Sequence, residues 1–129
     1  MGEDSLAAGM AIRREVMGDA YVDRAERNTS DFNQPFQDLV GEYCWGWLWT
    51  RDELPRRTRS LICIAMLAVL NRPNELKGHV RGALRNGCSE EEIREVLLHA
   101  TVYGGVPCGS DSFRIVREAL GEIAAEGGA

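Results

Sequence analysis

The apolar segment from Leu61 to Leu70 constrains the fold more than any other part of the sequence. It has about half the length that a helix needs to cross a bilayer, and it carries no polar face. A helix without a polar face is normally a central one, covered on all sides by neighbouring helices or by another subunit. We therefore expect this segment to lie in the core, within a helix that Pro55 opens and that runs through Asn71.

The rest of the sequence also has helical periodicity. Apolar residues recur every three to four positions in several segments, and no segment alternates with period two over more than a few residues. We expect an all-α bundle of about six helices, forming a single domain over residues 1–129. The first helix is expected at about residues 7–27, with an inner face formed by Ile12, Val16, Ala20 and Val22. The other helices are expected from about residue 32 to 43, from 55 to 71, from 73 to 86, from 89 onwards and around 113–123.

Local signals mark several helix ends. Gly87 can take the left-handed conformation that closes a helix beginning near Pro73. Ser89 begins "SEEE", which places Glu92 at the third helical position of a capping box. The glycine-rich stretch "YGGVPCGS" is expected to break the chain before the last helix. The aromatic stretch "WGWLWTRDEL" is expected to be a connection rather than a helix.

Composition and charge exclude several classes of protein. A chain of 129 residues can bury a core without disulfides or metals. Its net charge of -5 argues against nucleic acid as a partner, because phosphate binding needs a dense surface of lysine and arginine. We see neither a leader peptide nor a membrane span, and we expect a cytoplasmic protein. The four cysteines are widely separated, lack a C-x-x-C motif and are expected to be reduced, mostly structural thiols.

The stretch "RPNELKGH" holds Glu75 and His79 four positions apart, in a chain with two histidines. With 3.6 residues per turn, the two side chains lie on one line of a helix, at the border between its apolar stripe and solvent. They could be a working acid/base pair at the wall of a pocket. They could equally be a half-exposed pair worth a few tenths of a kcal/mol. A metal site is disfavoured, because helical metal bundles use Glu-x-x-His on several helices and His99 is the one other histidine.

Four arginines crowd into residues 51–59, and three of them lie in the first turns of a helix, where the helix dipole disfavours cations. Either nearby carboxylates such as Asp52 and Glu53 neutralise them, or part of the cluster holds an anionic ligand. Arg51, which follows Trp49 closely, and Arg59, which leads into the buried segment, are best placed for the second role. Of the three tryptophans in "CWGWLW", Trp45 and Trp49 could share a face.

These residues together resemble the carboxymuconolactone decarboxylase family, within the alkyl hydroperoxidase D-like helical group. The resemblance runs from about residue 32 to 120 and includes "FQDLVGEYCWGWLWTRDELPRRTRSL" and "AMLAVLNRPNELKGHVRGALRNGCSEEEIREVLLHATVYGGVP". Peroxidase relatives carry Glu-x11-Cys-x2-Cys-x3-His, which falls here on Ser60, Arg72, Glu75 and His79. Both cysteines of that thiol relay are missing, so a peroxidase is disfavoured. A non-catalytic helical interaction module would leave the arginine, tryptophan, glutamate and histidine set unexplained.

The resemblance implies a cofactor-free carboxy-lyase that acts on 4-carboxymuconolactone, a small anionic lactone, in the protocatechuate branch of the β-ketoadipate pathway. It also implies self-association to a trimer or hexamer. A related decarboxylase or lactone-processing enzyme acting on another acid is the alternative. His79 would be the catalytic acid, Glu75 its orienting partner, and Arg51 and Arg59 the anion clamps. Trp49 and Tyr103 would line the pocket, and His99 would be a second proton donor.

Overall fold

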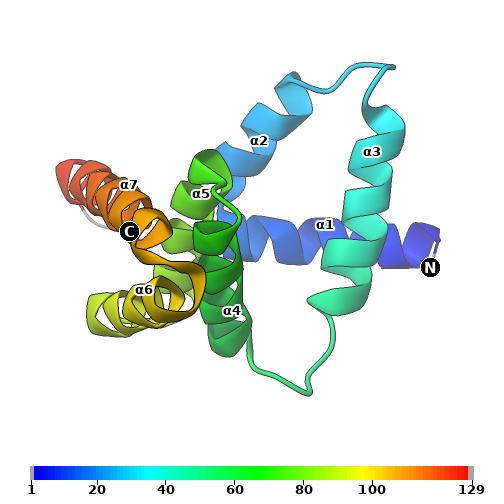
Figure 1. Ribbon diagram of the computed structural model, residues 1–129. Helices are drawn as coiled ribbons and strands as arrows, with labels where there is room; N and C mark the ends of the chain where they lie inside the picture. The colour runs from blue at the N-terminus through cyan, green and yellow to red at the C-terminus, as the bar shows by residue number, and fades with distance from the viewer. Residues whose placement is uncertain (1, 128–129) are drawn as a thin grey trace. The chain divides into compact units, whose positions relative to one another are not determined.

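The computed structural model describes residues 2–127, and these residues form helices and no strand (Figure 1). The all-α prediction is therefore confirmed. The chain divides into two compact units, one ending at Pro55 and the other beginning at Arg56. The expectation of one domain over residues 1–129 stays a prediction.

The first unit contains α1 (Glu3–Met17), α2 (Asp19–Arg27), α3 (Gln34–Leu39) and the π-helix η1 (Val40–Leu48). The predicted single helix over residues 7–27 is wrong, because Gly18 takes a φ of 89° and separates α1 from α2. A positive φ suits glycine, which has no Cβ to clash with the backbone. Within the predicted inner face, Val16 and Val22 are buried, but Ala20 is exposed.

Glycines allow α1 and η1 to pack backbone against backbone. A Cβ placed on Gly9 would lie 2.1 Å from the carbonyl oxygen of Gly41 and 2.6 Å from the nitrogen of Gly46. A Cβ on Gly46 would in turn lie 2.2 Å from the carbonyl oxygen of Ser5. The two helices therefore approach more closely than any side chain at these positions would allow.

The aromatic stretch lies in η1 and the turn after it, which corrects the prediction of a connection there. Nine consecutive residues, from Val40 to Leu48, take the π-helical form, although π-helices are rare and usually a single turn. The rings of Trp45 and Trp49 stack with their centroids 4.9 Å apart, as the shared face predicted, and both are buried. Trp47 is half exposed on another side.

The second unit contains α4 (Arg56–Val69), α5 (Pro73–Arg85), α6 (Glu90–Gly104) and α7 (Val106–Ala125). Helices α4 and α7 each pack against both α5 and α6, and they also contact each other. Their core includes Ile64, Leu76, Val80, Ile93 and Leu97, all almost completely buried. The predicted break at "YGGVPCGS" is shorter than expected, because Gly105 alone, with a φ of 108°, separates α6 from α7.

The predicted helix ends around α5 and α6 are confirmed. Gly87 has a φ of 92° just after α5. The Ser89 hydroxyl accepts a hydrogen bond from the backbone N–H of Glu92, and the Glu92 carboxylate accepts one from the backbone N–H of Ser89. This capping box satisfies two N–H groups that the first turn of α6 would otherwise leave open.

Within residues 2–127, helix α4 buries one side and exposes apolar side chains on another. Ile64 and Ala68 are buried, whereas Ile62, Met66 and Leu70 are 40%, 60% and 61% exposed. These three residues follow the helical repeat and form one apolar stripe. No helix within residues 2–127 is both long enough and apolar enough to span a membrane.

Candidate functional site

Helix α5 holds His79 on a firmly anchored scaffold. Leu76 and Val80 bury one side of the helix in the core. On another side, Lys77 donates a hydrogen bond to Glu122 on α7 at 2.9 Å, and Arg81 forms a bidentate pair with Glu126 at 2.7 and 2.9 Å. Apolar packing fixes the rotation of α5, and with it the direction of the His79 side chain, whereas exposed charged pairs of this kind contribute little energy.

His79 is half-buried, and burial lowers its pKa to about 4. Removing an imidazole from water disfavours its charged form, so the resting side chain is neutral at pH 7. A neutral imidazole carries one N–H donor and one nitrogen acceptor. It becomes an effective acid when a negative charge nearby raises its pKa towards the working pH.

The lowered pKa predicts a pH-dependent loss of stability. Above about pH 6.5 the imidazole is neutral in both the folded and the unfolded chain. As the pH falls towards 4, the unfolded chain takes up a proton that folded His79 does not. The free energy of unfolding should therefore decrease, by up to about 3 kcal/mol from this group.

Chemical denaturation at a series of pH values, on the wild type and His79→Gln, measures this contribution as the difference between the two curves. The His99→Gln variant, which removes the other histidine from an exposed position on α6, is the matched control. Equal slopes for wild type and His79→Gln between pH 6.5 and 4 would contradict the assignment.

Glu75 lies one turn before His79 and is exposed. Its side chain makes no hydrogen bond or ion pair with the residues between 2 and 127. The predicted position of the pair, at the border between core and solvent, therefore agrees with the half-buried histidine and the exposed glutamate. The proposed action of Glu75 on His79 stays a prediction, because the resting structure shows no bond between their side chains.

Arg59 and Ser60 are buried at the start of α4. The Ser60 hydroxyl accepts a hydrogen bond from the side-chain amide of Asn86 at 2.9 Å, which joins the start of α4 to the end of α5. His79 lies seven residues before Asn86, roughly 10 Å along the helix axis. The structure thus brings Arg59 and His79 onto two directly packed helices. Sequence reasoning did not single out Asn86, whose signal is its position at the C-terminal cap of α5.

His99 and Tyr103 lie together on the exposed side of α6. Their rings stack with centroids 5.0 Å apart, and Tyr103 is 82% exposed. Helix α6 packs mainly against α4 and α7, whereas His79 is on α5. Their assignment to the pocket wall is therefore still a prediction.

Arg51 and Trp49 belong to the first unit, and the structure describes them apart from the other predicted site residues. Trp49 is buried against Trp45. The Arg51 guanidinium is 3.7 Å from the Glu53 carboxylate and lies over the Trp47 ring at 5.1 Å. Exposed pairs of this kind contribute little energy. In the same arginine cluster, Arg57 is paired with Glu92, as the neutralisation alternative predicted.

The thiols and acidic groups do not form a redox or metal centre in the described part of the chain. None of the four cysteines forms a disulfide, and burial raises the pKa of the Cys88 and Cys44 thiols, which disfavours the reactive thiolate. The Cys88 thiol instead donates to the backbone carbonyl of Arg57 at 3.4 Å. Residues 2–127 contain no cluster of three or more histidine, cysteine, aspartate or glutamate side chains able to hold a metal ion.

Comparison with known proteins identifies the family. Residues 34–118 match the model of the carboxymuconolactone decarboxylase family. The chain belongs to this family. The matched residues contain both the Arg59 and Ser60 region of α4 and the Glu75 and His79 helix, so the family match covers the candidate site.

Two relatives extend the match over nearly the whole chain. A 4-carboxymuconolactone decarboxylase from Acinetobacter baylyi is 37% identical over 94% of this chain and 90% of the relative. A nitrosuccinic acid decarboxylase from Metarhizium robertsii is also 37% identical, over 92% of this chain and 83% of the relative. The chain is thus a decarboxylase of the carboxymuconolactone decarboxylase family, and a carboxy-lyase as predicted. The two relatives are named for different acids, so the family match leaves the substrate open.

Proposed function

We propose that this carboxymuconolactone decarboxylase family member converts 4-carboxymuconolactone to 3-oxoadipate enol-lactone, in the protocatechuate branch of the β-ketoadipate pathway. The observation that carries the proposal is the half-buried His79, neutral at rest, on a helix packed directly against the one that bears buried Arg59. The 37% identity to a 4-carboxymuconolactone decarboxylase over 94% of the chain supports this choice of acid.

The reaction needs an electron sink, which the lactone itself supplies. Breaking the bond between the ring carbon and its carboxylate releases CO2 and leaves an electron pair on the ring. Conjugation carries that pair to the lactone carbonyl oxygen, forming a dienolate. A proton must then be delivered to carbon, which forms the new C–H bond and completes the enol-lactone. No organic cofactor or redox step is required.

His79 supplies the proton in this proposal. The substrate carries two carboxylates, and a negative charge close to an imidazole raises its pKa from the low resting value. Binding of the dianion therefore draws a proton onto His79. The charged imidazole delivers that proton to the dienolate carbon and returns to its neutral state. Glu75, which is exposed to solvent one turn before His79, would pass the next proton from water to His79.

Arginine side chains hold the acid. Arg59 is buried, and a guanidinium shielded from water binds a carboxylate more strongly than an exposed one does. We propose that Arg59 binds the acetate arm of the substrate and that Arg51 is a second anion-binding residue. Trp49 and Tyr103 would line the pocket, and His99 would be a second proton donor. The single change Arg59→Lys keeps the positive charge but loses the planar guanidinium with its paired N–H donors. Substrate binding should weaken, so KM should rise. An unchanged KM would remove Arg59 from this role.

A second candidate substrate is nitrosuccinic acid, because a decarboxylase named for it matches 92% of this chain. A nitro group can also accept the electron pair that a departing CO2 leaves behind. Measuring kcat/KM for both acids with one protein preparation decides between them. We expect 4-carboxymuconolactone to be the better substrate by at least about tenfold, a difference of about 1.4 kcal/mol in transition-state binding. A reversed preference would replace the proposed substrate.

Exposed apolar residues on α4 and on α6 support self-association to a trimer or hexamer. Met66 on α4 is 60% exposed, and Leu98 and Val102 on α6 are 46% and 79% exposed. Exposed apolar patches commonly mark interfaces between subunits. Sedimentation velocity should give the mass of three or six chains, and a monomer at micromolar concentration would contradict the proposal.

We also propose a cytoplasmic location, which fits a chain whose four cysteines form no disulfide. Cell fractionation would test it, and recovery of the protein in an extracytoplasmic fraction would contradict it.

A further inference from the structure

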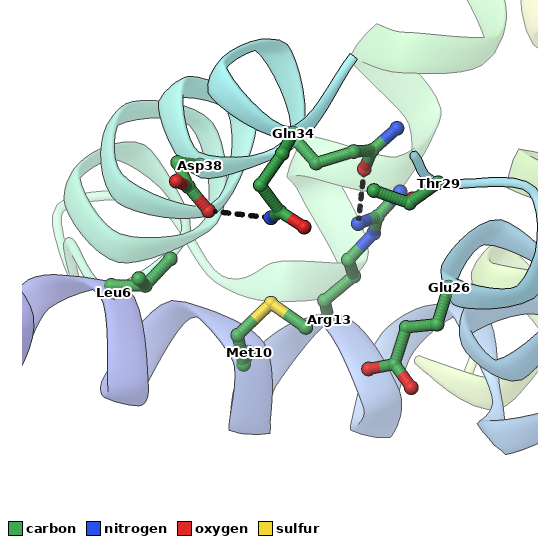
Figure 2. A pocket seen from close by; sticks show the side chains of 8 residues that line it. Leu6, Met10, Arg13, Glu26, Thr29, Gln34 and Asp38 are labelled. Atoms are coloured by element: carbon green, nitrogen blue, oxygen red, sulfur yellow. Dashed lines mark hydrogen bonds between the residues drawn. The ribbon is translucent and has the colours of Figure 1, made fainter. Parts of the chain in front are cut away.

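The first unit contains a buried cation that the proposed reaction does not use. Arg13 on α1 is only 8% exposed. Its Nη1 donates a hydrogen bond to the Oε1 of Gln37 on α3 at 3.1 Å, as the dashed line in Figure 2 shows. Its Nε is buried and has no hydrogen-bond partner among residues 2–127. A buried arginine with an unused donor is costly unless something accepts from it.

The neighbours of Arg13 do not neutralise its charge. Within residues 2–127 it forms no ion pair, and its Cζ lies over the Tyr21 ring at 6.0 Å from the centroid. The adjacent Arg14, by contrast, pairs with Asp19, Asp23 and Glu26. The nearby Cys44 thiol does not supply a negative charge either, because burial raises its pKa.

Arg13 lies in the wall of a cavity of about 350 Å³ (Figure 2). This volume is within the range of small-molecule sites. Leu6 and Met10 give the cavity an apolar side, while Gln34, Gln37 and Thr29 give it polar groups. All of these residues belong to the first unit.

Two carboxylates in the wall limit the charge of a ligand. Asp38 accepts a hydrogen bond from the Gln34 amide at 2.9 Å, and Glu26 accepts one from Arg14 at 3.3 Å. Both are therefore already engaged with other side chains. Their negative charge repels any anion, and it repels a ligand with two carboxylates more strongly than a ligand with one. The cavity suits one negative charge next to Arg13 and a short apolar chain next to Leu6 and Met10.

We propose that this cavity binds a small monocarboxylate, with its carboxylate against the guanidinium of Arg13. A guanidinium presents paired N–H groups, which match the two oxygens of a carboxylate. A chain of two to four carbons then packs against Leu6 and Met10. The ligand differs from the dianion assigned to the His79 site, so the inference stands or falls independently of the proposed substrate.

Titration with sodium butyrate at constant ionic strength, followed by calorimetry and by NMR of labelled protein, tests the proposal. We expect saturable binding of one butyrate per chain, with shifts concentrated in α1 and α3. Succinate, with two negative charges, should bind at least about tenfold more weakly. No saturable binding of butyrate, or shifts confined to residues outside the first unit, would overturn the inference.

The decisive variant is Gln37→Glu, which is nearly isosteric and gives Arg13 a carboxylate of its own. Butyrate affinity should fall at least about tenfold, while the thermal midpoint of the ligand-free protein rises. Arg27→Gln is the matched control, because Arg27 is exposed on α2 and lies outside the cavity wall. Equal butyrate binding by the wild type and Gln37→Glu would contradict the assignment of Arg13, and the isosteric change keeps this test independent of misfolding.

Discussion

Replacing His79 with glutamine should lower kcat for decarboxylation of 4-carboxymuconolactone by at least about 100-fold, the usual contribution of a positioned general acid. Glutamine keeps a hydrogen-bonding group of similar size but cannot deliver a proton to carbon. Substrate binding through Arg59 should persist, so KM should change much less than kcat. Initial rates from the loss of substrate absorbance, measured across the pH range, separate the two parameters.

Lys77→Gln is the matched control on the same helix. Lys77 points towards Glu118 and Glu122 on α7, away from the proposed chemistry, so this variant should keep wild-type kcat. Circular dichroism establishes that both variants are folded. A His79→Gln protein with undiminished kcat would remove His79 from the mechanism, although the family assignment would stand.

The largest loss of stability is expected for Gly9→Ala. The added methyl group would lie 2.1 Å from the Gly41 carbonyl oxygen and 2.6 Å from the Gly46 nitrogen. Both are backbone atoms, which cannot rotate away as the end of a side chain can. Helices α1 and η1 must therefore move apart, and we expect a cost of about 3 kcal/mol or more.

Tryptophan fluorescence during chemical denaturation measures this effect in the first unit. All three tryptophans of the chain, Trp45, Trp47 and Trp49, lie in or just after η1 and report on its contact with α1. Gly121→Ala on α7 is the control, since its added Cβ meets nothing within 4 Å. It should leave the fluorescence transition unchanged and slightly stabilise its own helix. A fluorescence midpoint for Gly9→Ala equal to that of the wild type would show that the helices do not pack this closely.

The sequence predicted the second unit better than the first, for a physical reason. In the second unit the ends of α5 and α6 depend on local chemistry, such as the Ser89 and Glu92 capping box and the positive φ of Gly87. Such signals act over a few residues and can be read directly. In the first unit, Gly18 interrupts a helix whose apolar pattern continues across it, and η1 continues a helix through a glycine-containing aromatic segment. The break at Gly18 rests on a single positive φ, and the form of η1 depends on its packing against α1, which is distant in sequence.

The candidate site was predictable to a similar degree. Helical spacing placed Glu75 and His79 at the edge of the core, and the structure has the histidine half-buried and the glutamate exposed. Spacing did not reveal that burial lowers the pKa of His79, because the effect comes from the surrounding packing. Sequence reasoning also missed Arg13, although the sequence contained a signal for it. Arg13 falls on the same helical stripe as Gly9 and Val16, where a charged residue is unexpected.

Carbon-13 at the ring carboxylate of 4-carboxymuconolactone allows the most direct test of the proposed reaction. With wild-type protein in excess over substrate, a single turnover should release one labelled CO2 per substrate molecule and leave unlabelled enol-lactone, without added metal or cofactor. A lactone-processing reaction would instead consume the substrate and keep the label in the organic product. Retention of the label, or no reaction at all, would contradict the account.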